Sequence, residues 1–436
     1  MNFRVLYIIL VCIFILSCSK DQDDINPSIN IVSPVNYQKI NGGETIEITG
    51  IIKDDRNIER ITITLRDKKN TPVLRTITKA PTTSNSKSYN LSVNFAFNDL
   101  QMASGEYDFN VTVSDGINTT TKYVPILLEE VEKERMGVFV LSNSGNFSNI
   151  YMLDDSYNGS FYTAINGDFI GGAIDPTNQQ LINVGATVGA ISATELPLGG
   201  ELWSVLVPGN PPTPYYTGFY YNDQNIYLGK RNGGLQGYDK NGNPNYSTGT
   251  STGYFMESAF IHNEEYVVME EKPIVVNNIT RISLTWLYSG VRMHQTVTNS
   301  DIKGMYSLSS LTMVLLANTA SSAVAELIFY DVTTGGKYSP FNISSLGKID
   351  DCLEVGNGVY LVAAGGNLTY VNANNYSTLG YLNGVIADRI WFDELMGELY
   401  VANGNQLTIY DYSTRAIKGS YNHSEDIQEL YFWYNK

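Results

Sequence analysis

Short stretches in which apolar and polar residues alternate fill most of this chain. From Ile61 to Leu65 the sequence reads ITITL, which places isoleucines and threonines on opposite faces of an extended strand. Glycine, proline, asparagine or aspartate separates one stretch from the next, as turns between strands require. The pattern predicts half-buried β-strands from about residue 26 to the end, and therefore an all-β protein.

Residues 26–130 form the first predicted domain, a β-sandwich. Six strand-length stretches occur here: PSINIVSP, ETIEITGIIKD, ERITITLRD, SYNLSVNFAF, EYDFNVTVSDG and TTKYVPILLEE. The segment SGEYDFNVTVSDGINTTTKYVPI resembles the last strands of immunoglobulin-like and PKD-like modules, without the Cys…Trp…Cys core of antibody domains. Asp54, Asp55 and Asp115 fit calcium ligands or ordinary turn residues, and we expect the latter.

A sequence repeat occupies the chain from Met136 onward. Its clearest copies begin at Asp350 and Asp388, a period of 38 residues, and each contains a first strand, a tight turn, VYLVA or LYVAN, and two further strands. Four strands in about 40 residues is the size of a propeller blade. Looser copies begin near Asp168, Tyr215, Met256 and Lys303.

The two ends of the repeat region supply the parts of one more blade. The stretch 137–165 provides three strands, and the C-terminal EDIQELYFWYNK provides a missing innermost strand. With six internal units this predicts a seven-bladed β-propeller over 137–436, closed by both of its ends and preceded by a linker at 131–136. Six or eight blades stay open as alternatives, because the units between 167 and 252 are irregular.

An apolar leader precedes the first domain. Val5–Leu16 is almost wholly apolar, shorter than the roughly 20 residues of a membrane-spanning helix and typical of a signal peptide over 1–17. The sequence Ile15-Leu16-Ser17-Cys18 resembles the bacterial lipobox, in which the peptide is cut before the cysteine and the thiol carries lipid. The alternative is a secretory peptide with an incidental cysteine.

An acidic tether, residues 18–25, follows the predicted cut. Its SKDQDD resembles the export signal that carries Bacteroidetes lipoproteins to the outer face of the outer membrane. The alternative is a solvated linker. The resemblance implies a lipid-anchored protein on the cell surface, attached to the membrane through Cys18.

The composition of the chain limits the kinds of partner and site that we expect. The net charge of −16 argues against nucleic acid as a partner, because phosphates need a basic footprint. Cys352 is the one cysteine left beyond Cys18, so an internal disulfide is not expected, and a buried thiol is the favoured interpretation. Three scattered histidines and the absence of HExxH, CxxC, GxSxG or P-loop motifs give little support to a metal or cofactor site. We expect no cofactor.

Two stretches of the repeat region carry a family resemblance. GVFVLSNSGNFSNIYMLD resembles the opening blade of Bacteroidetes surface lipoproteins with a YncE-like seven-bladed propeller, and Tyr400–Asn403 with Ile409–Asp411 resembles the YVTN repeat. Members of this group capture cobamides or siderophores and cap outer-membrane transporters. The resemblance therefore implies ligand capture beside a TonB-dependent transporter. This chain differs at Ser142 and Ser144, where the opening motif often has Asn-Glu, and in its added sandwich.

Candidate ligand contacts are the residues at the start of each innermost strand, since these starts gather at one mouth of a propeller. The candidates are Tyr215, Tyr216, Phe255, Glu257, Lys303, Asp351, Asp388, Arg389 and Asp426. Three interpretations stay open: turn residues and core tyrosines, a capture site of aromatic faces and charges, or a catalytic pair of Asp351 with Asp388 or Asp426.

The favoured function is non-enzymatic: a surface lipoprotein whose propeller captures a small molecule, a glycan or a protein partner, with the sandwich as a spacer. One alternative is a polysaccharide hydrolase or lyase, which His262, His294 or His423 near the mouth would favour. Another is a glycan-binding or adhesion protein.

Overall fold

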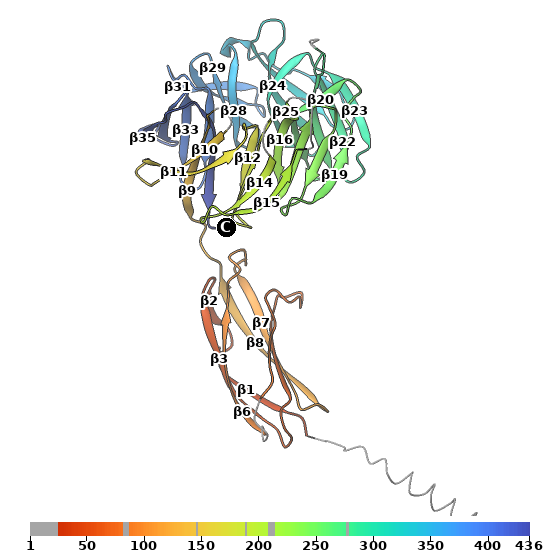
Figure 1. The fold of residues 1–436 in the computed structure, drawn as a ribbon, viewed down its shortest axis with the longest axis vertical. Helices are drawn as coiled ribbons and strands as arrows, with labels where there is room; N and C mark the ends of the chain where they lie inside the picture. The colour runs from red at the N-terminus through yellow and green to blue at the C-terminus, as the bar shows by residue number, and fades with distance from the viewer. Residues whose placement is uncertain (1–24, 82–86, 145–146, 188–189, 208–213, 276–278) are drawn as a thin grey trace, which may run out of the picture. The chain divides into compact units, whose positions relative to one another are not determined.

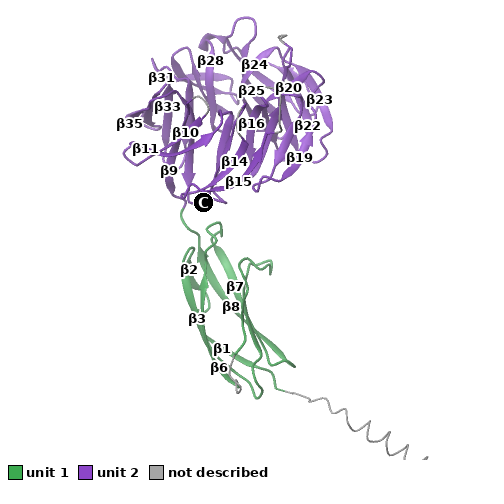
Figure 2. Cartoon of the chain, in the orientation of Figure 1, with its two compact units in different colours: residues 1–132 green, residues 133–436 purple. Residues whose placement is uncertain are grey.

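The structure, a computed structural model, describes residues 25–81, 87–144, 147–187, 190–207, 214–275 and 279–436 (Figure 1). The predicted leader, Cys18 and the acidic residues after it lie outside these ranges. The chain divides into two compact units, Met1–Glu132 and Lys133–Lys436 (Figure 2). Within the described ranges, no helix combines the length and apolar content needed to cross a bilayer.

The first unit is a sandwich of two sheets, with strand orders β1-β3-β6 and β2-β8-β7-β4-β5. Its strands are β1 (Ser28–Ser33), β2 (Gln38–Asn41), β3 (Thr45–Lys53), β4 (Arg60–Arg66), β5 (Ile77–Lys79), β6 (Ser88–Ala96), β7 (Gly105–Ser114) and β8 (Thr119–Glu129). The alternation in β4 is confirmed at Ile61 and Ile63, which are fully buried in the core between the sheets. Phe95, Phe97 and Phe109 meet edge to face in that core.

Asp115 acts as a turn residue in this unit. Its Oδ1 accepts hydrogen bonds from the backbone N–H groups of Ile117 at 2.8 Å and Asn118 at 2.6 Å. Burial and the nearby Asp115 raise the pKa of Asp54 to about 6. Among the described residues, no group of three or more His, Cys, Asp or Glu side chains is placed to hold a metal ion. The two backbone bonds make Asp115 a turn acid, as expected.

The described part of the second unit forms seven four-stranded antiparallel sheets. From the first, innermost strand outward they are β12 (Gly171–Asp175), β13 (Gln180–Val184), β14 (Ala190–Glu195), β15 (Glu201–Leu206); β16 (Tyr216–Asn222), β17 (Asn225–Lys230), β18 (Leu235–Tyr238), β19 (Pro244–Thr248); β20 (Tyr254–His262), β21 (Tyr266–Pro273), β22 (Arg281–Trp286), β23 (Arg292–Val297); β24 (Ser300–Ser309), β25 (Thr312–Thr319), β26 (Ala325–Asp331), β27 (Lys337–Tyr338); β28 (Ile349–Gly356), β29 (Val359–Ala364), β30 (Asn367–Asn372), β31 (Ser377–Asn383); β32 (Arg389–Asp393), β33 (Glu398–Asn403), β34 (Gln406–Asp411), β35 (Ile417–Asn422); and β36 (Ile427–Tyr434), β9 (Arg135–Ser144), β10 (Phe147–Leu153), β11 (Gly159–Asn166). A single 3₁₀ turn, Ser344–Leu346, lies between β27 and β28.

The sheets form a closed ring. Each first strand contacts the first strand of the next sheet, from β12 through β16, β20, β24, β28 and β32 to β36, which returns to β12. Close approach of β16 to β20 requires glycine at position 218, because a Cβ there would lie 2.2 Å from the carbonyl oxygen of Glu257. Buried apolar side chains fill the space between neighbouring sheets. The ring is therefore a β-propeller.

Both ends of the second unit share one sheet. The C-terminal β36 pairs antiparallel with β9, with Leu430 opposite Val140 and Tyr431 opposite Phe139. This confirms the prediction that the first and last pieces complete one sheet, and it leaves no open edge between them. The linker needs a correction, because β9 begins at Arg135 and residues 135–136 are already strand rather than connector.

Candidate functional site

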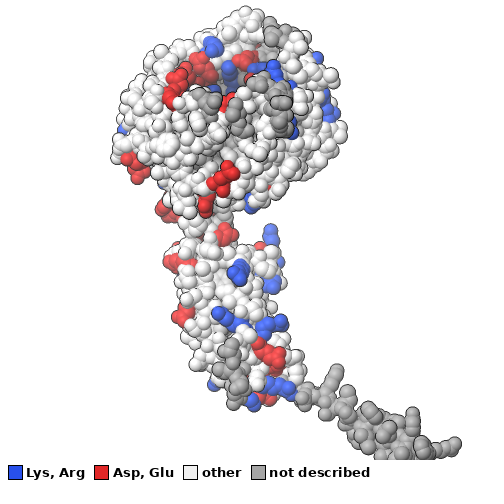
Figure 3. All heavy atoms as spheres, in the orientation of Figure 1, with Lys and Arg blue, Asp and Glu red and all other residues white. Residues whose placement is uncertain are grey.

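The starts of the first strands meet the loops between the second and third strands at one end of the ring. The N–H of Tyr215 donates to the carbonyl of Ala186, and the N–H of Arg231 donates to the carbonyl of Tyr215, both at 2.8 Å. We call this end of the ring the charged mouth. Figure 3 shows acidic and basic side chains gathered close together on the upper part of the second unit.

A cavity of about 370 Å³ opens at the charged mouth. Its walls come from three neighbouring sheets and include Arg231, Phe255, Lys272, Ile274, Asn299 and Asp301. The guanidinium carbon of Arg231 lies 4.3 Å from the centre of the Phe255 ring. Within the described part of the chain, no acid forms an ion pair with Arg231. The cavity therefore presents an aromatic ring and a cation that is free to bind an anionic group.

Lys272 anchors a network of ion pairs beside this cavity. Its Nζ lies 3.1 Å from Asp301, 3.4 Å from Glu257 and 3.8 Å from Glu270. Asp301 also pairs with Lys303 at 2.8 Å. Burial raises the pKa of Glu270 to about 7. The network holds Glu257 and Lys303 next to the cavity that Phe255 lines. All three residues are among the predicted ligand contacts.

A second group of charges lies on the first strands across the ring. Asp351 accepts hydrogen bonds from the N–H groups of Ile390 at 2.8 Å and Cys352 at 2.9 Å, and burial raises its pKa to about 6. Glu429 accepts hydrogen bonds from the indole N–H of Trp391 and from the N–H of Leu430. Burial raises the pKa of Glu429 to about 7. Glu429 lies within β36, so a search restricted to strand starts missed it.

The remaining predicted residues have other positions. Tyr215 and Tyr216 are 7% and 1% exposed and pack edge to face between two sheets, which corrects their interpretation as ligand contacts. Asp388 is exposed, and its Oδ2 accepts the N–H of Gly404 at 2.7 Å, as a turn acid does. Arg389 and Asp426 are exposed at the charged mouth but do not line the cavity around Phe255.

The three histidines have structural partners. His262 is fully buried and bonds Ser307 at 2.7 Å, and burial lowers its pKa. His423 is buried between Tyr421 and Ser142. His294 lies in the outer strand β23, and its Nε2 bonds the backbone carbonyl oxygen of Thr333. None of the three lines the cavity at the charged mouth.

Cys352 is also a buried side chain. Burial raises the pKa of its thiol to about 12, and the hydroxyl of Tyr306 donates to its carbonyl oxygen at 2.8 Å. A thiol held in this state is a poor nucleophile at neutral pH.

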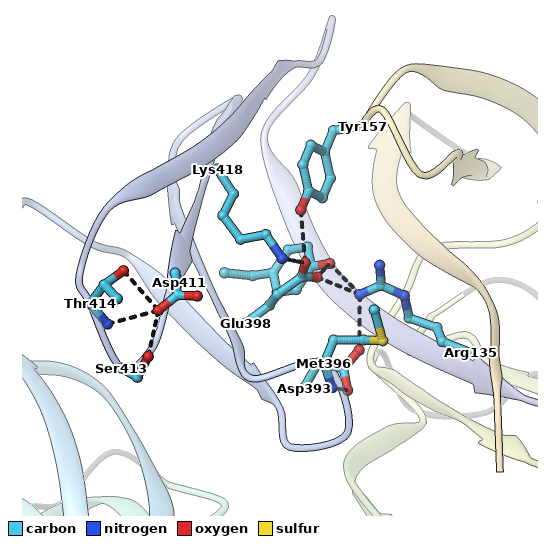
Figure 4. A network of polar contacts seen from close by, with 10 residues as sticks. Arg135, Tyr157, Asp393, Met396, Glu398, Asp411, Ser413, Thr414 and Lys418 are labelled. Carbon is cyan, nitrogen blue, oxygen red and sulfur yellow. Dashed lines mark hydrogen bonds and ion pairs between the residues drawn. The ribbon is translucent and has the colours of Figure 1, made fainter. Parts of the chain in front are cut away.

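At the other end of β32, buried charges tie the closing sheet to its neighbour (Figure 4). We call this group the latch. Arg135 of β9 pairs with Asp393 at 3.0 Å and with Glu398, and all three side chains are at most 7% exposed. Lys418 and the hydroxyls of Tyr157 and Tyr400 also bond Glu398. Burial would raise the pKa of Glu398, but these partners outweigh it and lower the pKa to about 2.

Comparisons with known proteins support an immunoglobulin-like first unit. Residues 27–121 match the family model of a bacterial Ig domain. A search of curated protein sequences found no match to the chain.

Solved structures resemble parts of the chain at low identity. A functionally unknown protein from Desulfotomaculum acetoxidans is 9% identical with a TM-score of 0.49, over 68% of this chain and 98% of that one. BamB from Moraxella catarrhalis is 14% identical with a TM-score of 0.41, over 68% and 92%. A protein of unknown function from Bacteroides caccae is 14% identical with a TM-score of 0.41, over 59% and 99%. At these scores the likenesses carry no functional argument, so the propeller assignment depends on the sheet topology.

Proposed function

We propose that this chain is a lipid-anchored protein of the outer membrane, exposed on the cell surface, whose propeller captures a small ligand at the charged mouth. One observation carries the proposal: the cavity of about 370 Å³ joins the Phe255 ring to the guanidinium of Arg231. Ligand pockets are commonly of this size and combine an apolar surface with a few fixed polar groups.

The surroundings support capture because the groups are held in place before a ligand arrives. Stacking on Phe255 orients the Arg231 guanidinium, and ion pairs with Asp301 and Glu257 restrain Lys272. Preorganised groups lose less entropy on binding than mobile ones do. A planar ligand that carries a carboxylate or another anionic group would stack on Phe255 and bond Arg231.

The first experiment is a screen for bound ligands. Thermal unfolding of the second unit is followed with a panel of cobamides, ferric siderophores and acidic glycans. A ligand in excess over its dissociation constant raises the melting temperature by mass action. If no compound of the panel shifts the transition, capture of these ligand classes is ruled out.

The anchor is tested separately in cells. We expect Cys18→Ser to prevent incorporation of labelled palmitate and to release the protein from the membrane fraction, because several acyl chains together provide stable anchoring. Added protease should degrade the wild-type protein on intact cells. A protected protein would place it on the inner face of the membrane and remove surface exposure from the proposal.

The proposed partner is a TonB-dependent transporter. Crosslinking in intact cells followed by mass spectrometry should recover an outer-membrane transporter with the wild-type protein. Recovery of no outer-membrane protein would limit the proposal to capture without a transporter.

A further inference from the structure

A second cavity, of about 430 Å³, lies between the innermost strands at the end of the ring opposite the charged mouth. It is formed by the later halves of β28, β32 and β36, together with Ile174 at the end of β12. Five aromatic side chains share its walls: Trp391, Phe392, Tyr431, Phe432 and Tyr434. None of the five is fully buried, so their surfaces are accessible from the cavity. We call it the aromatic cavity.

The charges of the aromatic cavity have one sign. Glu354 and Glu394 line it, and no lysine, arginine or histidine of the described residues does. The carboxylate of a third acid, Glu429, accepts the indole N–H of Trp391. A hydrogen bond from the indole to an acid adds electron density to the ring, which strengthens its attraction for cations. Aromatic faces and carboxylates together favour a cation over an anion.

A cation already contacts one of these rings. The ammonium of Lys133 lies 4.2 Å from the centre of the Tyr434 ring. The hydroxyl of Tyr434 donates to Asp393 at 2.8 Å, so the ring is held in a fixed position. Lys133 does not line the cavity, so the contact shows only that the Tyr434 ring holds an ammonium group on one of its faces.

We propose that the aromatic cavity binds a small organic cation, an alkylammonium group, between its aromatic faces and the carboxylates of Glu354 and Glu394. This site does not depend on ligand capture at the charged mouth, because the lining residues of the two cavities are different. A sugar fits less well, since its hydroxyls need acceptors and donors, and the charged side chains here are acceptors alone.

The experiment compares choline with its neutral isostere, 3,3-dimethylbutan-1-ol, at constant ionic strength set with sodium chloride. Binding is followed by intrinsic tryptophan fluorescence, with Trp391→Phe used to assign the signal, and by calorimetry. We expect saturable binding of choline at millimolar concentration, and at least about tenfold weaker binding of the isostere.

Variants identify the site. Glu354→Gln with Glu394→Gln should weaken choline binding about tenfold. Arg231→Met, in the other cavity, should leave choline binding unchanged. Far-ultraviolet circular dichroism confirms that each variant is folded. Equal binding of choline and the isostere, no saturation by about 100 mM choline, or equal loss in the Arg231 variant would each overturn the proposal.

Discussion

Two groups of acids in the second unit differ in their partners. In the latch, Asp393 and Glu398 pair with Arg135, and the pKa of Glu398 is lowered to about 2. Nearer the axis, Asp351 and Glu429 accept hydrogen bonds but form no ion pair within the described ranges, and burial raises their pKa values to about 6 and about 7. The burial of an acid alone therefore does not show whether the acid has a structural or a functional role.

The presence or absence of a paired cation separates the two roles. The paired acids of the latch have a structural role, and the unpaired acids nearer the axis are candidates for a functional role. Paired acids stabilise the closing sheet, whereas acids that are buried without a cation cost stability when ionised. Groups that a fold retains at such a cost are common at functional sites.

The largest effect is expected from the latch. Arg135→Met leaves the carboxylates of Asp393 and Glu398 buried without their main cation, since they are 0% and 1% exposed. Breaking a buried pair in this way typically costs about 3–5 kcal/mol. Urea denaturation should show this loss in the transition of the second unit, with the transition of the first unit unchanged as an internal control. A loss below about 1 kcal/mol would mean that the latch does not hold the ring.

A stabilising effect is expected from Glu429→Gln. The folded protein binds the proton on Glu429 more tightly than the unfolded chain does, since the pKa rises from 4.5 to about 7. The stability contributed by the protonated acid is therefore lost as pH rises from 4.5 through about 7. Glutamine keeps the Oε1 acceptor for Trp391 and Leu430 and carries no charge.

At about pH 8 the free energy of unfolding of the Glu429→Gln variant should exceed that of the wild type by about 3 kcal/mol, and the two values should converge at about pH 4.5. Neighbouring Asp351 and Arg389 are left unchanged in both proteins. Chemical denaturation across this pH range provides the measurement. A difference that does not depend on pH would contradict the raised pKa of Glu429.

The smallest effect is expected from Lys418→Met. Lys418 pairs with the same Glu398 as Arg135 does, but its side chain is 37% exposed. Water screens an exposed pair, so the loss should stay below about 1 kcal/mol. This variant is the matched control for Arg135→Met under the same denaturation conditions. A loss as large as that of Arg135→Met would show that burial does not distinguish the two cations.

Much of the fold could be predicted from the sequence because strands repeat with a fixed pattern. Alternation located the main strands of the first unit, and the repeat starting at Asp350 and Asp388 matches the sheets that begin with β28 and β32. The C-terminal stretch EDIQELYFWYNK could be assigned to the closing sheet because residues 137–165 supply three strands of a blade without an innermost one. Short strands such as β2 and β5 were missed, since four or fewer residues show no clear period.

The candidate site was harder to predict, because its members are adjacent only in the folded ring. Arg231 lies in the loop after β17, outside the strand starts that were searched, and its stacking on Phe255 depends on the approach of the next sheet. Tyr215 and Tyr216 do lie at a strand start, but alternation cannot tell which neighbouring sheet covers them. Arg135 reaches Glu398 across 263 positions of sequence, which no local pattern encodes.

The most direct test of the account is a matched pair of charge removals at the charged mouth. Arg231→Met removes the free cation of the cavity, and Lys348→Met removes an exposed cation, paired with Asp350, at the start of β28. Melting temperatures are measured with and without the best ligand of the screen. We predict that the ligand stabilises the wild type and the Lys348 variant by the same amount and the Arg231 variant by little. Equal stabilisation of all three proteins would contradict capture at this cavity.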